Sequence, residues 1–247
     1  MTTTHTLIDR IYSTGYFTNH GPIANELEST LEQNFNIENA IIVSNESLAV
    51  VIALAGLTTG RSVAVSADTP VHVLNCITWA GLEPTFIDSG SDSFLFSVEH
   101  FESVIDKQHV DLVILDSATE KKLAPSSYET FLISGLPTIV YRCSLLPNSD
   151  PLYSSIASVR ICLIDTDGDS PSPNCAAILT SNNELARTYR NIRSSYGARE
   201  IVSVMATANG RVSEYQAGVA LKFIQNLAQS WQEDQDRDLQ QQIDCAR

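Results

Sequence analysis

Residues 40–66 read AIIVSNESLAVVIALAGLTTGRSVAVS, a stretch in which two short β-branched runs flank a longer apolar one. The outer runs, Ala40–Ser44 and Ser62–Ser66, are short and almost continuously apolar, which is typical of strands buried on both faces. The run between them, from Leu48 to Gly56, predicts a helix that ends at the glycine. A strand, a helix and a second strand in this order predict a crossover between parallel strands.

The same alternation continues along the chain. Strands are predicted at residues 83–88, 110–115, 137–141, 159–164 and 175–180, and helices at 24–35, 71–80, 97–105, 183–195 and 212 to about 237. This pattern predicts an α/β fold with a mostly parallel mixed sheet and helices on both faces. Residues 1–228 are assigned to this single domain. Residues 229–247, which are rich in Gln and Asp, are assigned to a polar C-terminal helical tail.

The composition excludes several classes of function. The chain has 29 Asp and Glu against 15 Lys and Arg, a net charge of −14, and its longest basic run is Lys121-Lys122. We therefore expect neither nucleic acid nor an anionic membrane surface as a partner, because both demand basic patches. No apolar run reaches the roughly 18 residues of a membrane span. The odd number of cysteines, without C-x-x-C spacing, predicts reduced thiols in a cytoplasmic protein.

Four segments in the right order carry a resemblance to a known family. They are Tyr16–Pro22 with Glu26 and Glu28, Val43–Leu54, Ala80–Asp88 and Asn209–Ala217. The last reads NGRVSEYQA and is similar to the pattern N-Y-R-M-S-E-x-Q-A of the DegT/DnrJ/EryC1/StrS family of PLP-dependent sugar aminotransferases, a branch of fold type I. The resemblance runs from about Thr14 to Arg237. It implies the large domain of that fold, with the family's smaller C-terminal domain absent from this sequence.

The family's catalytic lysine belongs in a loop that resembles residues 163–180. A transaminase needs this lysine to form a Schiff base with the cofactor and to shuttle a proton. Matching without gaps puts Gly168 at the lysine position. The four lysines of the chain lie elsewhere, at Lys107, Lys121, Lys122 and Lys222. The resemblance therefore implies a chain that lacks the Schiff-base lysine.

Other positions that hold the cofactor in the family are also altered. Tyr141 and Arg142 stand where a carboxylate would pair with the pyridine nitrogen, and a cation there opposes protonation of that nitrogen. Glu46 replaces the glycine of the phosphate loop, while Ser47 keeps the hydroxyl at the helix N-terminus. Pro70 takes the place of the aromatic residue that stacks on the ring. These changes predict a site that no longer holds PLP.

Two polar clusters offer other chemistry for the vacated cleft. Asp165 and Asp167 open a D-x-D-G-D run that resembles the start of a calcium-binding loop. The glycine and bidentate glutamate of such a loop are missing, so an acidic surface loop is favoured and we expect no metal. Asp68 and His72 lie about one helical turn apart and could act as a general acid and base. A helix-entry cap beside an ordinary histidine is the favoured alternative.

The turn at residues 209–217 keeps the family pattern. Asn209 resembles the residue that reaches the partner subunit's phosphate in the family, and the turn lies near the family's dimer interface. The resemblance therefore implies that this interface is preserved. Arg211 and Glu214 are expected to form an ion pair that ties the long helix to the turn before it.

The function expected from these observations is that of a non-catalytic scaffold or partner subunit. It would form a homodimer, or a heterodimer with an aminotransferase or another enzyme of its pathway, and would bind no cofactor. One alternative is an enzyme or ligand binder that reuses the cleft through Asp68, His72, Arg142, Asp165 and Asp167. The other is an active PLP-dependent sugar aminotransferase, if matching without gaps misplaces the lysine.

Overall fold

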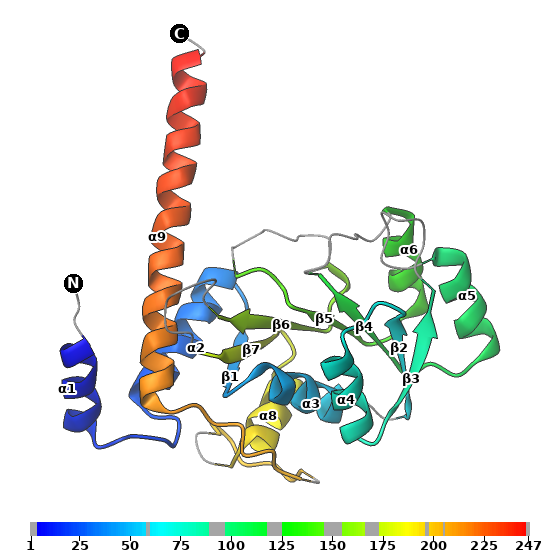
Figure 1. The fold of residues 1–247 in the computed structure, drawn as a ribbon, viewed down its shortest axis with the longest axis horizontal. Helices are drawn as coiled ribbons and strands as arrows, with labels where there is room; N and C mark the ends of the chain where they lie inside the picture. Colours follow the sequence, from blue (N-terminus) through cyan, green and yellow to red (C-terminus); the bar gives the residue numbers. More distant parts are fainter. Residues whose placement is uncertain are drawn as a thin grey trace.

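A seven-stranded mixed sheet lies at the centre of the protein (Figure 1). The computed structural model describes residues 4–57, 60–88, 97–117, 125–145, 155–165, 173–195, 198–204 and 206–245. The strand order is β1-β7-β6-β5-β4-β2-β3, and β7 is antiparallel to both of its neighbours while the other pairs are parallel. The strands are β1 (Asn39–Val43), β2 (Ser62–Ser66), β3 (Glu83–Ile87), β4 (Leu112–Asp116), β5 (Thr138–Tyr141), β6 (Val159–Ile164) and β7 (Cys175–Thr180).

Helices cover both faces of this sheet, as the sequence predicts. On one face, a core that includes Leu27, Phe101 and Leu221 joins the sheet to helices α1, α2, α5, α6 and α9. On the other, a core that includes Ile52 and Tyr189 joins it to α3, α4 and α8. The helices are α1 (Thr4–Thr14), α2 (Pro22–Phe35), α3 (Glu46–Leu57), α4 (Val71–Trp79), α5 (Val98–Lys107), α6 (Pro125–Ser134), α8 (Asn183–Arg193) and α9 (Glu214–Cys245).

The apolar runs in the sequence reflect this double coverage. Every residue of β1, β4, β5 and β7 is buried, so these strands show no alternation of polar and apolar side chains. Cys76, Cys143, Cys162 and Cys175 are buried and reduced, as predicted. Among the residues that the structure describes, no helix is both long enough and apolar enough to cross a membrane.

Four helices differ from the predicted ones. Helices α1 and α6 do not appear among the predictions, and α2 begins at Pro22 instead of residue 24. Proline suits the first helical position, because its missing N–H would have no partner within the helix. The long helix α9 runs from Glu214 to Cys245, past the end predicted near residue 237 and through most of the stretch assigned to a helical tail, and its distal part projects away from the sheet (Figure 1).

A buried ion pair joins α2 and α8, which cover opposite faces of the sheet, along the outer edge of β1. Nη1 of Arg193, a fully buried side chain, donates to Oε1 of Glu28 over 2.7 Å and to the carbonyl oxygen of Ile42 over 3.2 Å. The N–H of Ile42 donates to the same carboxylate, and Nε2 of His20 lies 3.3 Å from its other oxygen. Burial alone would raise the pKa of Glu28, but the charge of Arg193 and the contact with His20 outweigh it and lower the pKa to about 2.

This pKa predicts a specific acid sensitivity. The folded-state value of about 2 lies below the ordinary 4.5, so Glu28 contributes stability that is fully present above pH 4.5 and is lost as the pH falls towards 2. We expect the urea midpoint of the wild type to fall more steeply across this interval than that of Glu28→Gln, which cannot titrate. Parallel slopes for the two proteins would contradict the prediction.

Candidate functional site

The polar residues singled out in the sequence meet at the carboxyl edge of the sheet. Glu46 begins α3, His72 is the second residue of α4, and Tyr141 ends β5. Because β7 alone runs against the other strands, β1, β2 and β5 all end at this edge, so these three residues converge. In open α/β sheets this edge is the usual place for a ligand.

Glu46, Tyr141 and His72 form one hydrogen-bonded chain, which we call the cleft relay. The buried hydroxyl of Tyr141 donates to Oε1 of Glu46 and lies 2.7 Å from Nε2 of His72. The same Nε2 is 3.7 Å from Oε2 of Glu46. A phenol has one proton and gives it to the carboxylate, so Nε2–H of His72 is the donor to the Tyr141 oxygen. The relay thus links α3, β5 and α4 through side chains.

Arg142 lies next to the relay, but its guanidinium group pairs with Asp116 and not with a residue of the relay. Its Nε donates to Oδ1 of Asp116 over 3.1 Å, and its Nη2 bonds to Oδ2 of the same buried carboxylate. These bonds with Asp116 raise the pKa of Arg142. The guanidinium carbon is 5.4 Å from the ring centre of Tyr141, a distance typical of a cation–π contact. The cation predicted for the cleft is therefore neutralised by an aspartate that ends β4.

An unusual backbone conformation holds Arg142 in this place. Its φ is +54°, in the left-handed region that is uncommon for residues other than glycine. The hydroxyl of Ser117 donates to the carbonyl oxygens of both Tyr141 and Arg142, at 3.1 and 2.9 Å, and so fastens the end of β5 to the end of β4. Sequence reasoning missed Asp116 and Ser117 as partners of Arg142. The signal available in the sequence was a polar pair directly after an apolar strand.

The start of α3 does not fit a bound phosphate group. The N–H of Leu48 donates to Oδ1 of Asn45 over 2.9 Å, and the carboxylate of Glu46 lies in the first helical turn. A carboxylate there interacts favourably with the positive end of the helix dipole and would repel a phosphate dianion. Ser47 lies beside α4, where its carbonyl oxygen accepts a hydrogen bond from Sγ of Cys76.

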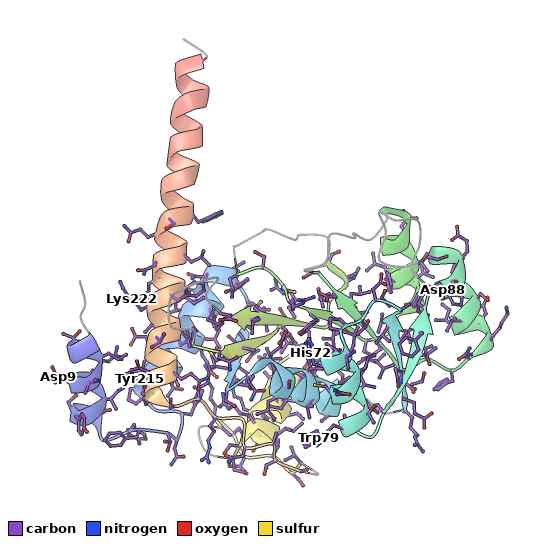
Figure 2. The ribbon with its side chains drawn as sticks, in the orientation of Figure 1. Asp9, His72, Trp79, Asp88, Tyr215 and Lys222 are labelled. Atoms are coloured by element: carbon purple, nitrogen blue, oxygen red, sulfur yellow. The ribbon has the colours of Figure 1, made fainter. Side chains whose placement is uncertain are left out.

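The lysines that the structure describes lie away from this edge. Nζ of Lys107 donates to Ser103 within α5, and Lys222 lies on α9, well separated from His72 (Figure 2). Lys121, Lys122 and the predicted lysine position, Gly168, are outside the described residues. Among the described residues, neither lysine and nothing at the start of α3 supplies the groups that PLP would need at this edge.

The other predicted residues are placed around the relay. Pro70 is the N-cap residue of α4, and Asp68 is exposed in the turn before it. Asp165 is exposed just after β6, and its charge contributes, after burial, to the raised pKa of Cys175. Asp167 is outside the described residues. His72 contacts Tyr141 and Glu46, and its pairing with Asp68 stays a prediction. No cluster of three possible metal-binding side chains occurs in the described part of the chain.

The ion pair predicted between Arg211 and Glu214 is wrong. Arg211 donates to the side-chain oxygens of Asn19 and Asn209, both over 2.7 Å. Glu214 is fully buried and turns towards the start of α2, where it accepts the N–H groups of residues 21, 23 and 24 at 2.9, 2.7 and 3.2 Å. The carboxylate of Glu214 thus satisfies N–H groups that have no partner within α2, while Arg211 is held by two side-chain oxygens.

Gln216, in the same turn, holds the rim of the cleft. Its side-chain amide donates to the carbonyl oxygens of Ser44, Pro173 and Asn174, at 3.0, 2.8 and 3.1 Å. The N–H of Ser44 also donates to the carbonyl oxygen of Gly210. The turn therefore fixes the segment before α3 and the segment before β7 by contacts within one chain. This gives the turn a structural role that needs no partner subunit.

Residues 2–116 match the DegT/DnrJ/EryC1/StrS aminotransferase family. The chain is aminotransferase-like. It is 26% identical over 98 residues to dTDP-4-amino-4,6-dideoxy-D-glucose transaminase from Escherichia coli, a stretch that covers 40% of this chain and 26% of that enzyme. The resemblance to this family is thereby confirmed.

Several solved structures share the fold of this chain. NtdA of Bacillus subtilis, solved with bound PMP, superposes with a TM-score of 0.73 at 18% identity, covering 89% of this chain and 51% of that one. A DegT/DnrJ/EryC1/StrS aminotransferase from Brucella abortus gives 0.71 at 21%, covering 89% and 62%. DesI, solved with its TDP-sugar product, gives 0.75 at 16%, covering 91% and 58%. The aminotransferase-like chain thus has the fold of the type I large domain and spans between half and two thirds of these proteins.

Proposed function

We propose that this chain is a relative of the sugar aminotransferases that does not transaminate and acts as a scaffold or partner subunit. The observation that carries the proposal is the contact between Tyr141 and Glu46. These residues take the two positions that resemble the pyridine and phosphate contacts of the family. Here they bond to each other, so the chain satisfies with its own side chains the groups that a cofactor would otherwise meet.

The charges at the edge support the same conclusion. A pyridine nitrogen is activated by a neighbouring carboxylate, but the carboxylate of Asp116 is already engaged by Arg142. The first turn of α3 carries the charge of Glu46, and Gly168 has no amine to offer. Each of these features removes one group that transamination requires. A scaffold does not require any of those groups.

The proposal is tested by the covalent chemistry of lysine. We expect the purified chain, mixed with an equimolar amount of PLP and reduced with borohydride, to show no added mass by intact mass spectrometry. An active sugar aminotransferase treated in parallel should be labelled stoichiometrically. Stoichiometric addition at Lys121 or Lys122, located by peptide mapping, would sink the proposal, because either lysine could then replace the missing amine.

A double variant separates the effect of the missing lysine from the effect of the altered phosphate and pyridine positions. Glu46→Gly with Tyr141→Asp restores the residue types of the family at both positions. We expect equilibrium dialysis to show non-covalent binding of PLP that the wild type lacks, still without a covalent adduct. Equal binding by the wild type would show that Glu46 and Tyr141 do not oppose the cofactor.

A reused cleft remains the second candidate function, and the cleft relay is the observation that favours it. His72 is part-exposed, so a ligand can reach the ring nitrogen that does not face Tyr141. Through Tyr141 this nitrogen is coupled to the carboxylate of Glu46, the arrangement of a general base held by an acidic group. A small molecule that stabilises the wild type against heat but does not stabilise His72→Ala would support this function over a scaffold.

A further inference from the structure

A groove lies between α3 and α4, next to the cleft relay. Its volume is about 340 Å³, at the small end of the roughly 300–1,000 Å³ typical of ligand pockets. The residues of α4 that line it are spaced i, i+3, i+4 and i+7, so they lie on one face of that helix. We call this feature the α3–α4 groove. Its lining is Ser47, Leu48 and Val51 from α3, and His72, Asn75, Cys76 and Trp79 from α4.

The groove has an apolar floor and an exposed aromatic wall. Val51 and Cys76 are 8 and 5% exposed, and Leu48 is half-buried. Trp79, at the end of α4, is 71% exposed. Helix α3 is apolar on all sides over residues 48–56, which is typical of a helix that is covered all round. A flat aromatic ligand would cover the apolar floor and pack against the exposed indole ring.

The thiol in the floor of the groove stays neutral. Sγ of Cys76 donates to the carbonyl oxygen of Ser47 over 3.6 Å. Burial raises the pKa of Cys76; the hydrogen bond to Ser47 offsets part of this effect, and the charge of Glu46 adds to it. A thiol with a raised pKa is a poor nucleophile. Cys76 therefore offers a ligand an apolar contact and no covalent chemistry.

His72 gives the groove a fixed hydrogen-bonding polarity. The hydroxyl of Tyr141 donates to Glu46, so Nε2–H of His72 is the donor to the Tyr141 oxygen, 2.7 Å away. In the neutral imidazole the other nitrogen, Nδ1, then accepts hydrogen bonds. The side chain is 44% exposed and lines the groove, so a ligand there can reach this nitrogen. The relay thereby selects a ligand that donates an N–H or O–H group.

The charges around the groove disfavour an anionic ligand. Glu46 places a carboxylate in the first turn of α3, and Asp68 lies exposed in the turn before α4. Among the described residues that line the groove there is no lysine or arginine, and the nearby Arg142 is paired with Asp116. The net charge of −14 adds to the repulsion. A neutral or cationic ligand meets no such barrier, and a cation also interacts favourably with the face of Trp79.

The length of the groove sets the size of the ligand. His72 and Trp79 are seven residues apart on α4, roughly 10 Å along the helix axis, and Figure 2 shows them at opposite ends of this helix. A molecule that touches both residues needs about the length of two fused rings and one hydrogen bond. A single ring would reach only one of the two residues.

We propose that the α3–α4 groove binds a small molecule of two fused aromatic rings that carries an N–H or O–H donor and no negative charge. Its rings cover Leu48 and Val51 and pack against Trp79, while its donor bonds to Nδ1 of His72. The inference rests on the cleft relay, which also favours the second candidate function, and goes beyond that function by assigning the groove and the class of ligand. It requires nothing of the scaffold role.

The test compares probes of the same shape, with binding to the full chain measured by titration calorimetry. Indole and benzofuran differ by a ring N–H that is replaced by an oxygen. We expect indole to bind with a dissociation constant of about 1 mM or below. Benzofuran should bind at least about 10-fold more weakly, because it has no donor for His72. Indole-5-carboxylate should show no binding, because the groove holds no cation to offset its charge.

Three variants separate the groove from non-specific binding. Trp79→Ser should weaken the binding of indole at least about 10-fold. Ile133→Ser, which removes an apolar residue that is 85% exposed on α6, should leave it unchanged. In Glu46→Gln the new amide can donate to the Tyr141 oxygen, so Tyr141 can donate to His72 and leave the proton on Nδ1. We expect this variant to lose the preference for indole over benzofuran. Circular dichroism checks that each variant is folded.

Several results would overturn the inference. They are failure of indole to bind, equal binding of indole and benzofuran to the wild type, and unchanged binding of indole to Trp79→Ser. A preference for indole that survives in Glu46→Gln would overturn it as well, because the relay would then not set the polarity of His72. None of these probes forms a Schiff base with lysine, so failure of this inference is distinguishable from failure of the proposed function.

Discussion

Replacing Arg193 by methionine is expected to lower the free energy of unfolding by about 3–5 kcal/mol. Glu28 and Arg193 are 1% and 0% exposed, so the change leaves a carboxylate buried without its cation. Methionine fills much of the same volume, which keeps the loss of packing small, so most of the destabilisation comes from the uncompensated charge. Urea unfolding followed by circular dichroism measures the effect.

Two further variants show whether the charge is the cause. Arg187→Met breaks an exposed ion pair between the same helix and Glu200 and should cost no more than about 1 kcal/mol. Adding Glu28→Gln to Arg193→Met removes the orphaned charge and should restore part of the stability. If Glu28→Gln lowers the stability of Arg193→Met by as much as it lowers the stability of the wild type, the two residues do not stabilise the protein as an ion pair.

Glu214→Ala should be nearly as damaging, at about 3–5 kcal/mol. One buried carboxylate accepts three N–H groups at the start of α2, and hydrogen bonds to charged groups contribute about 1.5–3 kcal/mol each. The contribution is below their sum because water can enter and satisfy part of the exposed N-terminus. Thermal unfolding measures the total loss of stability in Glu214→Ala. Faster hydrogen exchange at the N–H groups of residues 21, 23 and 24 would show that this loss arises at the start of α2.

The control for this change is a carboxylate of the same type in a different setting. Glu26 lies on α2 and pairs with Arg10 at the surface, so Glu26→Ala should cost about 1 kcal/mol or less. Glu214→Gln keeps one acceptor oxygen and should lie between the wild type and Glu214→Ala. Unchanged exchange at the start of α2 in Glu214→Ala would mean that these N–H groups do not depend on the carboxylate.

Much of the fold could be predicted because most of its strands are buried on both faces. A continuous apolar run such as Leu112–Leu115 is recognisable without knowledge of its neighbours. Helix α6 could not be recognised in this way. Its sequence places Leu132 and Ile133 side by side, and both are exposed, so no apolar face repeats at helical spacing.

The candidate site was predicted residue by residue but not as an arrangement. Position in a motif singled out Glu46, Tyr141 and His72, yet these residues are separated by tens of positions and nothing local requires them to touch. The partner of Arg142 is 26 residues away on the neighbouring strand. Such contacts follow from which strands are adjacent in the sheet and where each of them ends.

The sequence by itself determined most of the elements, the resemblance to the sugar aminotransferases, and the glycine at the predicted lysine position, because these depend on local pattern and residue identity. Only the tertiary structure decided what the remaining polar groups do. Arg211 and Glu214 are three residues apart and look like a pair, but Glu214 turns to the start of α2, 190 residues away in sequence. A buried charge takes the partner that compensates its lost hydration best, and that partner is fixed by folding and not by proximity along the chain.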